Sequence, residues 1–493
     1  MTSRRPLEVL RSLAPHAVAL AVLLWPLVGV LYVPMVDLPG HLAITRVLDD
    51  YLHGSFRDSL QLNLDPVHKP AYVLLYALFA VLPKPLVGPV AAGAIVVLFH
   101  AAVVYGIASL AKRPASSPLV ASLALLIGMF VYNSLFFWGL IPFLLAMPPA
   151  LLAYVAYLRA SGSVDGPGTT RDALVFIVAA VLAHVVHPLA TIFLAIMVAG
   201  AALAAILSES MERATGRSQA TAHALWAIAW PPLLWMAAVA ALQYLTAPPD
   251  YGGTLGRSAA AVAAPFHGLK AARAFLAQTG IELGMVPTRE PAATLVAYPV
   301  AVALFLIAAL AALRVVSLTS RPLRHGTGPA EPAPVRAPGR RLAVVFVVSV
   351  FLYLFVRHDL LPMPHRNLWF PVRAPGFLVF FFGILAAALV LRRLPSSGPP
   401  PIVAAMLILG ALAIASERSA VLHMHFASFD EKVQAFFRGD VPDRYFRSQP
   451  FSYVDHIRAY NCFFDAACKD HSGLFFAIYP DATIYPVSRI APR

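Results

Sequence analysis

Long apolar stretches recur along the chain and constrain its fold more than any other feature. A transmembrane helix needs about 20 mainly apolar residues, because the lipid interior offers the backbone no hydrogen-bond partner outside its own helix. Such stretches occur at residues 15–34, 88–111, 118–137, 139–158, 173–187, 189–207, 223–245, 292–313, 342–356, 375–391 and 401–416. They predict an all-α polytopic integral membrane protein with about eleven transmembrane helices.

The composition excludes an ordinary soluble domain. Only 12% of the 493 residues are charged and 59% are hydrophobic, whereas a typical soluble domain is roughly 25% charged. The net charge of +13 does not indicate nucleic-acid binding, because the arginines lie between apolar segments and form no basic stripe. We therefore expect a lipid bilayer, and no nucleic acid, as a partner.

The basic residues between the apolar stretches predict which side of the membrane each loop faces, because short cytoplasmic loops are enriched in Lys and Arg. Residues 72–82 form an apolar segment between Pro70 and Pro83 that is too short to span, so we interpret it as a re-entrant or interfacial helix. We then expect a multi-pass membrane protein with a cytoplasmic N-terminus and a periplasmic or extracellular C-terminus; the bacterial inner (cytoplasmic) membrane is what the family resemblance given below implies. The connectors placed inside carry Lys112 and Arg113, Arg159 and Arg171, Arg213 and Arg217, the loop 314–341, and Arg392 and Arg393.

Two parts are predicted. Residues 1–416 form the transmembrane part, with an extracytoplasmic first loop at 35–87 and a Pro/Gly-rich cytoplasmic linker at 314–341. Residues 417–493 form a small extracytoplasmic tail of mixed structure. Its Cys462 and Cys468 favour a structural disulfide, because an oxidising compartment permits one, over redox chemistry, for which the sequence has no Cys-x-x-Cys.

The string Asp37–His41 (DLPGH) follows the first predicted span directly. A carboxylate held where a helix leaves the membrane suits a general base, and His41 four residues later is placed to orient it. Arg46 follows within the same segment as a candidate substrate ligand. The alternative is that Asp37 only caps the next helix, expected at 40–52.

Further polar residues lie in the loops predicted to face outward. His184 and His187 share a helix face and suit a phosphate or a metal, or simple packing. Arginine matches phosphate oxygens in a bidentate fork, so Arg366 and Arg373 are candidate ligands of a leaving phosphate; interfacial anchoring is the alternative. The remaining candidate substrate-binding residues are Lys69, Tyr72, Asn133, Trp138 and His365.

A first loop that opens with Asp37 and ends in Lys69-Pro70-Ala71-Tyr72 before an apolar helix resembles the GT-C superfamily of integral membrane glycosyltransferases. The strings Asp37–His41, Phe137–Leu140 (FWGL) and His187–Leu189 (HPL) are also similar to strings in uncharacterised bacterial membrane proteins that are distantly related to that superfamily. The resemblance implies a GT-C-like helical fold, a polyprenyl-phosphate-linked sugar donor and a site on the outer side.

These features favour a membrane glycosyltransferase that transfers a sugar from a polyprenyl-phosphate donor to an envelope or lipid acceptor on the outer face. No cofactor is expected, and a divalent metal stays open. One alternative is a transporter or flippase of a lipid-linked substrate, although no Asp, Glu, Lys or Arg sits in the middle of a predicted span and only His100 and a broken helix at Pro231–Pro232 favour it. A second alternative is a non-catalytic component of envelope assembly.

Overall fold

The computed structural model describes residues 6–35, 37–54, 60–62, 70–83, 86–161, 169–213, 238, 302–307, 370–394, 401–440 and 487–489. The described residues are mostly helical, and the only sheet among them is one pairing of two short strands. The main elements are α1 (Pro6–Leu24), η1 (Trp25–Leu27), α2 (Leu38–Leu52), β1 (Leu60–Leu62), α3 (Pro70–Val81), α4 (Val87–Ala111), α5 (Pro118–Gly128), η3 (Met129–Val131), α6 (Ser134–Trp138), α7 (Ile141–Ala160), α8 (Thr170–Val186), α9 (Pro188–Arg213), α15 (Phe370–Arg392), α16 (Pro401–Phe437) and β2 (Val487–Arg489).

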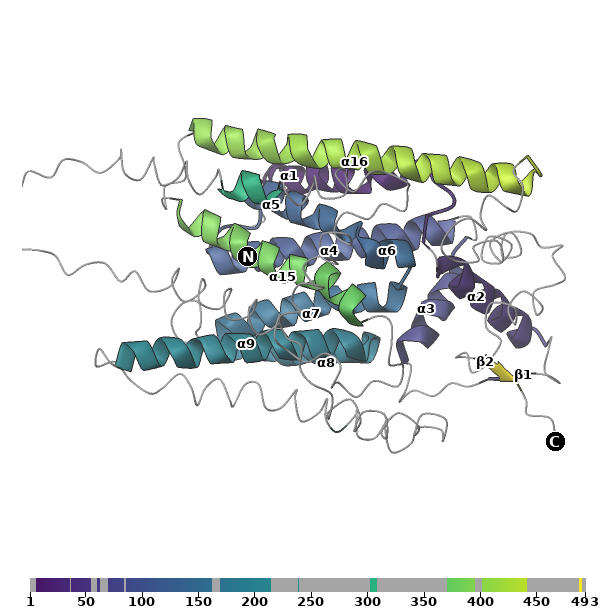
Figure 1. Ribbon diagram of the computed structural model, residues 1–493, viewed down its shortest axis with the longest axis horizontal. Coiled ribbons are helices and arrows are strands. Elements are labelled where there is room, and N and C mark those ends of the chain that lie inside the picture. Colours follow the sequence, from purple (N-terminus) through teal and green to yellow (C-terminus); the bar gives the residue numbers. More distant parts are fainter. Residues whose placement is uncertain are drawn as a thin grey trace, which may run out of the picture.

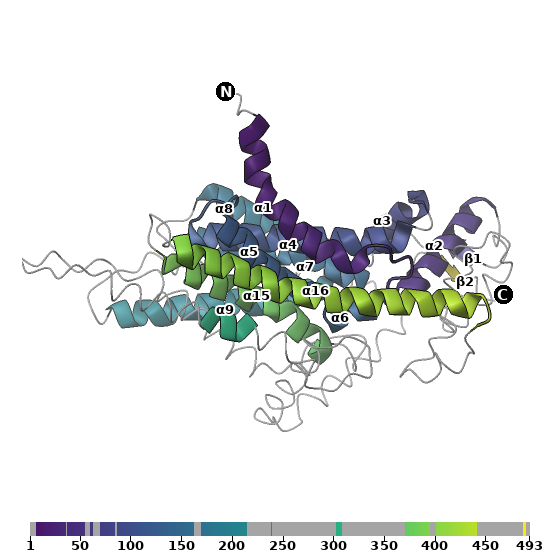
Figure 2. The same ribbon diagram turned by 90° about the horizontal axis from the view of Figure 1, so that it is seen from above.

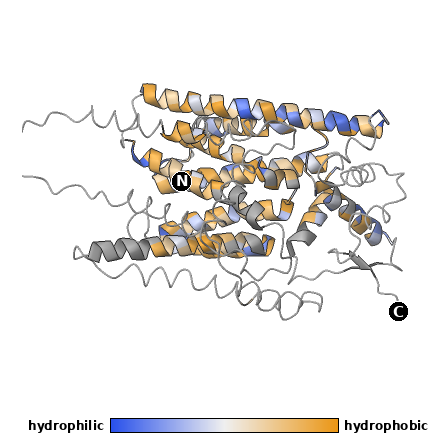
Figure 3. Ribbon diagram, in the orientation of Figure 1, coloured by the Kyte–Doolittle hydropathy of each residue, from blue (hydrophilic) through white to orange (hydrophobic). Residues whose placement is uncertain are grey.

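Three helices in the described part, α4, α7 and α16, are long and apolar enough to cross a membrane. Shorter apolar helical stretches lie at Ser12–Leu27, Pro118–Val131, Phe193–Leu203 and Val379–Arg392, and the apolar colouring covers most of the bundle (Figure 3). The protein is therefore a helical membrane protein. The number of spans stays a prediction, because 223–245, 342–356 and most of 292–313 lie outside the described residues.

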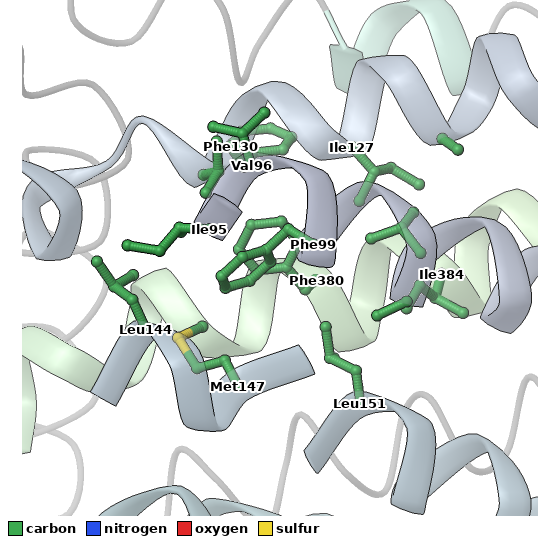
Figure 4. Close-up of a cluster of buried hydrophobic side chains, with 14 of the residues drawn as sticks. Ile95, Val96, Phe99, Ile127, Phe130, Leu144, Met147, Leu151, Phe380 and Ile384 are labelled. Carbon is green, nitrogen blue, oxygen red and sulfur yellow. The ribbon is translucent and has the colours of Figure 1, made fainter. Parts of the chain in front are cut away.

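The long helices pack side by side around one apolar core (Figures 1 and 2). In its centre the rings of Phe99 on α4 and Phe380 on α15 lie 4.5 Å apart, beside Met147 and Leu151 of α7 (Figure 4). A Cβ on Gly106 of α4 would come within 2.9 Å of Ile384 on α15. Small residues that let helix backbones approach closely are typical of helix packing in membranes.

One end of the bundle carries the basic connectors. Arg113 Nη2 donates to the carbonyl oxygen of Leu394 at 2.9 Å, and Arg392 Nε donates to that of Leu110 at 2.6 Å. Arg159 pairs with Asp172 at 3.0 Å. We call this the arginine end, and it comprises Lys112, Arg113, Arg159, Arg171, Arg392 and Arg393.

The opposite end, which we call the Asp37 end, carries Asp37, α2, α3, α6 and the start of α7 (Figure 1). The strands β1 and β2 also lie there and pair antiparallel, with Leu60 opposite Arg489. The first loop and the C-terminal segment are therefore neighbours, and both lie at the end opposite the arginine end. Which end faces the cytoplasm stays a prediction.

Two predicted spans are shorter in the structure. The stretch 15–34 was expected to be helical throughout, but α1 ends at Leu24 and gives way to η1, because Pro26 lacks an amide hydrogen and Gly29 has a φ of 73°. The stretch 118–137 is also broken, since α5 ends at Gly128 and a new helix begins after Asn133. The segment 72–82 forms the twelve-residue helix α3.

The helix α16 is longer than the predicted span 401–416 and continues to Phe437, so the expected boundary at 416/417 falls inside it. The charged residues from Glu417 onward suggested an end, yet the helix continues because its far half is held by the bundle. The Asp430 carboxylate accepts the backbone N–H groups of Leu31 at 3.0 Å and Tyr32 at 2.5 Å. Asp430 thereby fixes the non-helical segment that leads from η1 to Asp37.

Candidate functional site

Asp37 lies directly before α2, and its carbonyl oxygen accepts the N–H of His41 at 3.0 Å. Its side chain makes no capping hydrogen bond to α2, so the capping role that the sequence allowed is not seen. Gly139, which follows α6, packs directly against this backbone. A Cβ on Gly139 would lie 2.9 Å from the amide nitrogen of Asp37 and 3.0 Å from that of Leu38. The Asp37–His41 and Phe137–Leu140 strings therefore meet in space.

His41 joins α2 to α3. It is 7% exposed, and its Nδ1 lies 3.1 Å from the hydroxyl oxygen of Tyr76. Burial lowers the pKa of His41 from 6.5 to about 4, because the charged ring would lose its water. The described partner of the ring is thus Tyr76, and the predicted orienting role of His41 toward Asp37 stays a prediction.

The buried His41 predicts a loss of stability in acid. In the unfolded chain His41 binds a proton below about pH 6.5, whereas in the folded protein it does so only near pH 4. The contribution of neutral His41 to the free energy of unfolding is therefore complete above pH 6.5 and is lost as the pH falls toward 4. At about pH 5 this effect of His41 alone lowers the free energy of unfolding by about 2 kcal/mol relative to neutral pH. We expect His41→Asn to shrink the difference in melting temperature between about pH 7.5 and pH 5. The control His53→Asn changes an exposed histidine next to the same helix and is expected to keep the wild-type difference; an unchanged difference in His41→Asn would contradict the prediction.

Two other candidates make local contacts. Arg46 Nε lies 3.2 Å from an oxygen of Asp50, its neighbour one turn along α2. Asn133 is 1% exposed, and its Oδ1 accepts the N–H of Leu135 at 2.9 Å, which caps α6. The sequence predicted substrate binding by both residues. The structure adds the cap, which explains why a helix begins there.

His184 and His187 both lie where α8 meets α9. His184 Nδ1 lies 3.2 Å from the hydroxyl oxygen of Thr191 on α9, and both residues are buried. The His187 ring packs edge-on against Phe143 of α7, with centroids 5.4 Å apart. These contacts fit the packing role. No group of three or more metal-ligating side chains gathers among the described residues.

The start of α7 brings these strings together. Gly139 contacts the backbone of Asp37, and Phe143, four residues later, contacts His187. The helix α15 also contacts α6, and because Arg392 lies at the arginine end, its first turn with Arg373 lies at the Asp37 end. The predicted residues Asp37, His41 and His187, and the backbone of Arg373, therefore share one end of the bundle. Lys69, His365, Arg366, Cys462 and Cys468 lie outside the described residues, as do the side chains of Tyr72, Trp138 and Arg373.

Sequence reasoning missed Tyr76, Gly139 and Asp430 as parts of this end. Gly139 had a readable signal, since a glycine after a short aromatic helix commonly ends it with a left-handed residue, here with φ 72°. Tyr76 looked like one of many apolar residues in 72–82, and only the packing of α3 on α2 reveals its contact with His41. Asp430 gave no signal, because its partners are backbone groups almost 400 residues away.

The fold defines a class: a helical membrane protein in which short helices cover one end of the bundle. No family model matches the chain, and no curated protein matches it.

Proposed function

We propose that the chain is an integral membrane glycosyltransferase that transfers a sugar from a polyprenyl-phosphate-linked donor to an envelope or lipid acceptor at the Asp37 end. The observation that supports this most is the meeting of Asp37, Gly139, Phe143 and His187 around the start of α7. Three strings that lie far apart in the sequence thereby contribute to one place. A site on a helical bundle at the membrane boundary suits a substrate with an apolar tail and a polar head.

The chemistry assigned to the chain is a displacement at the anomeric carbon. Asp37 takes the proton of the acceptor hydroxyl, the acceptor oxygen bonds to the anomeric carbon, and the bond from that carbon to the phosphate oxygen breaks. The configuration inverts, and polyprenyl phosphate leaves with the bonding electron pair. Arg366 and Arg373 are proposed to stabilise the charge that develops on this phosphate.

The short helices support a role in covering the reacting groups. The helix α3 packs on α2 and also reaches α7 and α8, and the His41–Tyr76 contact ties it to the helix that begins at Asp37. A site from which water is excluded protects a sugar donor from hydrolysis. Arg46, Lys69 and Tyr72 belong to the same loop and are proposed to contact the donor.

The test is product formation by the full-length protein in proteoliposomes. A panel of polyprenyl-phosphate-linked hexoses and pentoses is supplied with membrane-lipid acceptors, and mass spectrometry follows the sugar. We expect a glycosylated acceptor together with free polyprenyl phosphate. Counterflow of the lipid-linked sugar without a covalent product would contradict the transferase and favour a carrier. Neither product nor counterflow, with stable co-purification of envelope proteins, would favour a structural role.

A further inference from the structure

A pair of histidines from α1 and α4 lies away from the Asp37 end, with His100 buried and His16 partly exposed. His16 Nδ1 lies 3.4 Å from His100 Nε2, and the rings meet edge to face with centroids 5.6 Å apart. His16 Nε2 lies 2.8 Å from the carbonyl oxygen of Ala115, in the exposed connector between α4 and α5. His100 is 3% exposed and sits half-way along α4. The contacts therefore lead from the bundle interior to the arginine end.

Hydrogen-bonding rules assign the protons of this pair. A carbonyl oxygen can only accept, so His16 Nε2 carries a hydrogen. Neutral His16 then has a lone pair on Nδ1, and its contact with His100 requires a hydrogen on His100 Nε2. The remaining nitrogen, His100 Nδ1, is an acceptor that is fully buried and has no hydrogen-bond partner among the described residues. Because burial disfavours a charged ring, His100 can take a hydrogen at Nδ1 only if it gives up the one on Nε2.

The carboxylates on the elements around the pair are Glu8 of α1 and Glu417, Asp430 and Glu431 of α16. Neither α4, α5, α7 nor α15 contains Asp or Glu, and α5 contains no ionisable side chain at all. Two positive charges 3.4 Å apart would repel each other strongly, so the pair takes up one excess proton and not two. The helices and the connector that pack here carry further titratable or charged groups. These are Glu8 and Arg11 on α1, Tyr105, Lys112, the backbone-bonded Arg113 and Arg392, Tyr154, Tyr157, the ion-paired Arg159, Arg373, and on α16 Glu417, Arg418, His423, His425, Asp430, Glu431 and Lys432.

We propose that His16 and His100 form a proton-binding site that holds one excess proton between the two rings. The incoming proton bonds to His100 Nδ1. The Nε2–H bond of His100 then breaks, and that hydrogen bonds to His16 Nδ1. The excess charge resides on His16, the more exposed ring, which keeps its hydrogen bond to Ala115, and His100 is neutral again in its other tautomer.

The pair places a titratable group, His100, within the long apolar helix α4. Ionisable side chains inside a bundle commonly mark proton pathways. The pair joins α1 to α4 and to the α4–α5 connector, so gain of a proton changes how these three segments hold together. The site is independent of the sugar transfer proposed for the Asp37 end.

The test uses full-length protein with ¹⁵N-labelled histidine in lipid nanodiscs. Imidazole nitrogen shifts, followed by NMR from about pH 8 to pH 5, distinguish protonated from unprotonated nitrogens. The variants His16→Gln and His100→Gln each keep an N–H at the ε position, so the structural hydrogen bonds persist while proton transfer between the rings is lost. His53→Asn, at an exposed site, identifies a signal unrelated to the pair and serves as the control.

We expect the wild-type signals of His16 and His100 to change together with one midpoint. In His16→Gln the His100 signal is expected to stay neutral over the whole range, and in His100→Gln the His16 midpoint is expected to shift by about one pH unit. The proposal is overturned if the remaining histidine of a variant with wild-type thermal stability keeps its wild-type midpoint. If only one of the two variants folds, that variant decides. If neither folds, two separate midpoints for His16 and His100 in the wild-type protein overturn the proposal.

Discussion

Asp37→Asn is expected to lower sugar transfer from the lipid-linked donor by about 10²- to 10⁴-fold, the contribution that a positioned general base makes. Asparagine has nearly the same shape as aspartate and cannot take the acceptor proton. The contacts of residue 37 with Gly139 and His41 use its backbone, which the substitution does not change. Donor binding and melting temperature are therefore expected to stay near the wild-type values.

The matched control is Asp49→Asn on the same helix. Asp49 has a half-exposed side chain that pairs with His53, away from Gly139. Its replacement removes one negative charge from α2 without touching the proposed base, so transfer is expected to persist. Equal rates for Asp37→Asn and the wild-type protein would remove Asp37 from the chemistry, and equal losses in both variants would indicate a general charge effect.

Gly139→Ala is expected to reduce transfer by about 100-fold, through displacement of Asp37. The added Cβ would lie 2.9 Å from the Asp37 amide nitrogen, and backbone atoms cannot rotate away as a side chain can. The left-handed conformation of residue 139, with φ 72°, costs an alanine a further ~1–2 kcal/mol. A fall in both melting temperature and transfer rate is the expected result.

Gly439→Ala separates these two effects. Gly439 also has a left-handed backbone, with φ 83°, but a Cβ there would meet nothing within 4 Å. The variant therefore reproduces the conformational cost without the contact at Asp37. It is expected to lower the melting temperature slightly and to leave transfer intact. Similar losses of transfer in both glycine variants would mean that the approach of Gly139 to Asp37 has no special role.

The helical class of the fold could be read from the sequence, but several helix ends could not. Apolar length predicts α4 and α7 well, because the lipid requirement acts within one segment. It fails at α5, where the apolar run continues past Gly128 although Asn133 starts a new helix. It fails again in α16, because Asp430 holds the polar half of that helix against the segment after η1.

The sequence identified single candidate residues of the site but not how these residues contact one another. The Asp37–His41 string attracted attention because a carboxylate and an imidazole follow an apolar span. That Gly139 supports Asp37 and that Tyr76 holds His41 depends on contacts between helices distant in sequence, which no periodicity encodes. For the same reason the His16–His100 pair was not anticipated, since each histidine alone resembles a packed core residue.

The central claim is that the Asp37 end is a functional site facing away from the cytoplasm, where lipid-linked sugars are used in the proposed reaction. The direct measurement is labelling of single cysteines by a membrane-impermeant maleimide, with Cys462 and Cys468 replaced by serine. One cysteine replaces exposed His53 at the Asp37 end, and the other replaces exposed Ser116 at the arginine end. We predict that His53→Cys is labelled in intact cells and Ser116→Cys only after permeabilisation. The reverse pattern would place Asp37 in the cytoplasm and contradict the account.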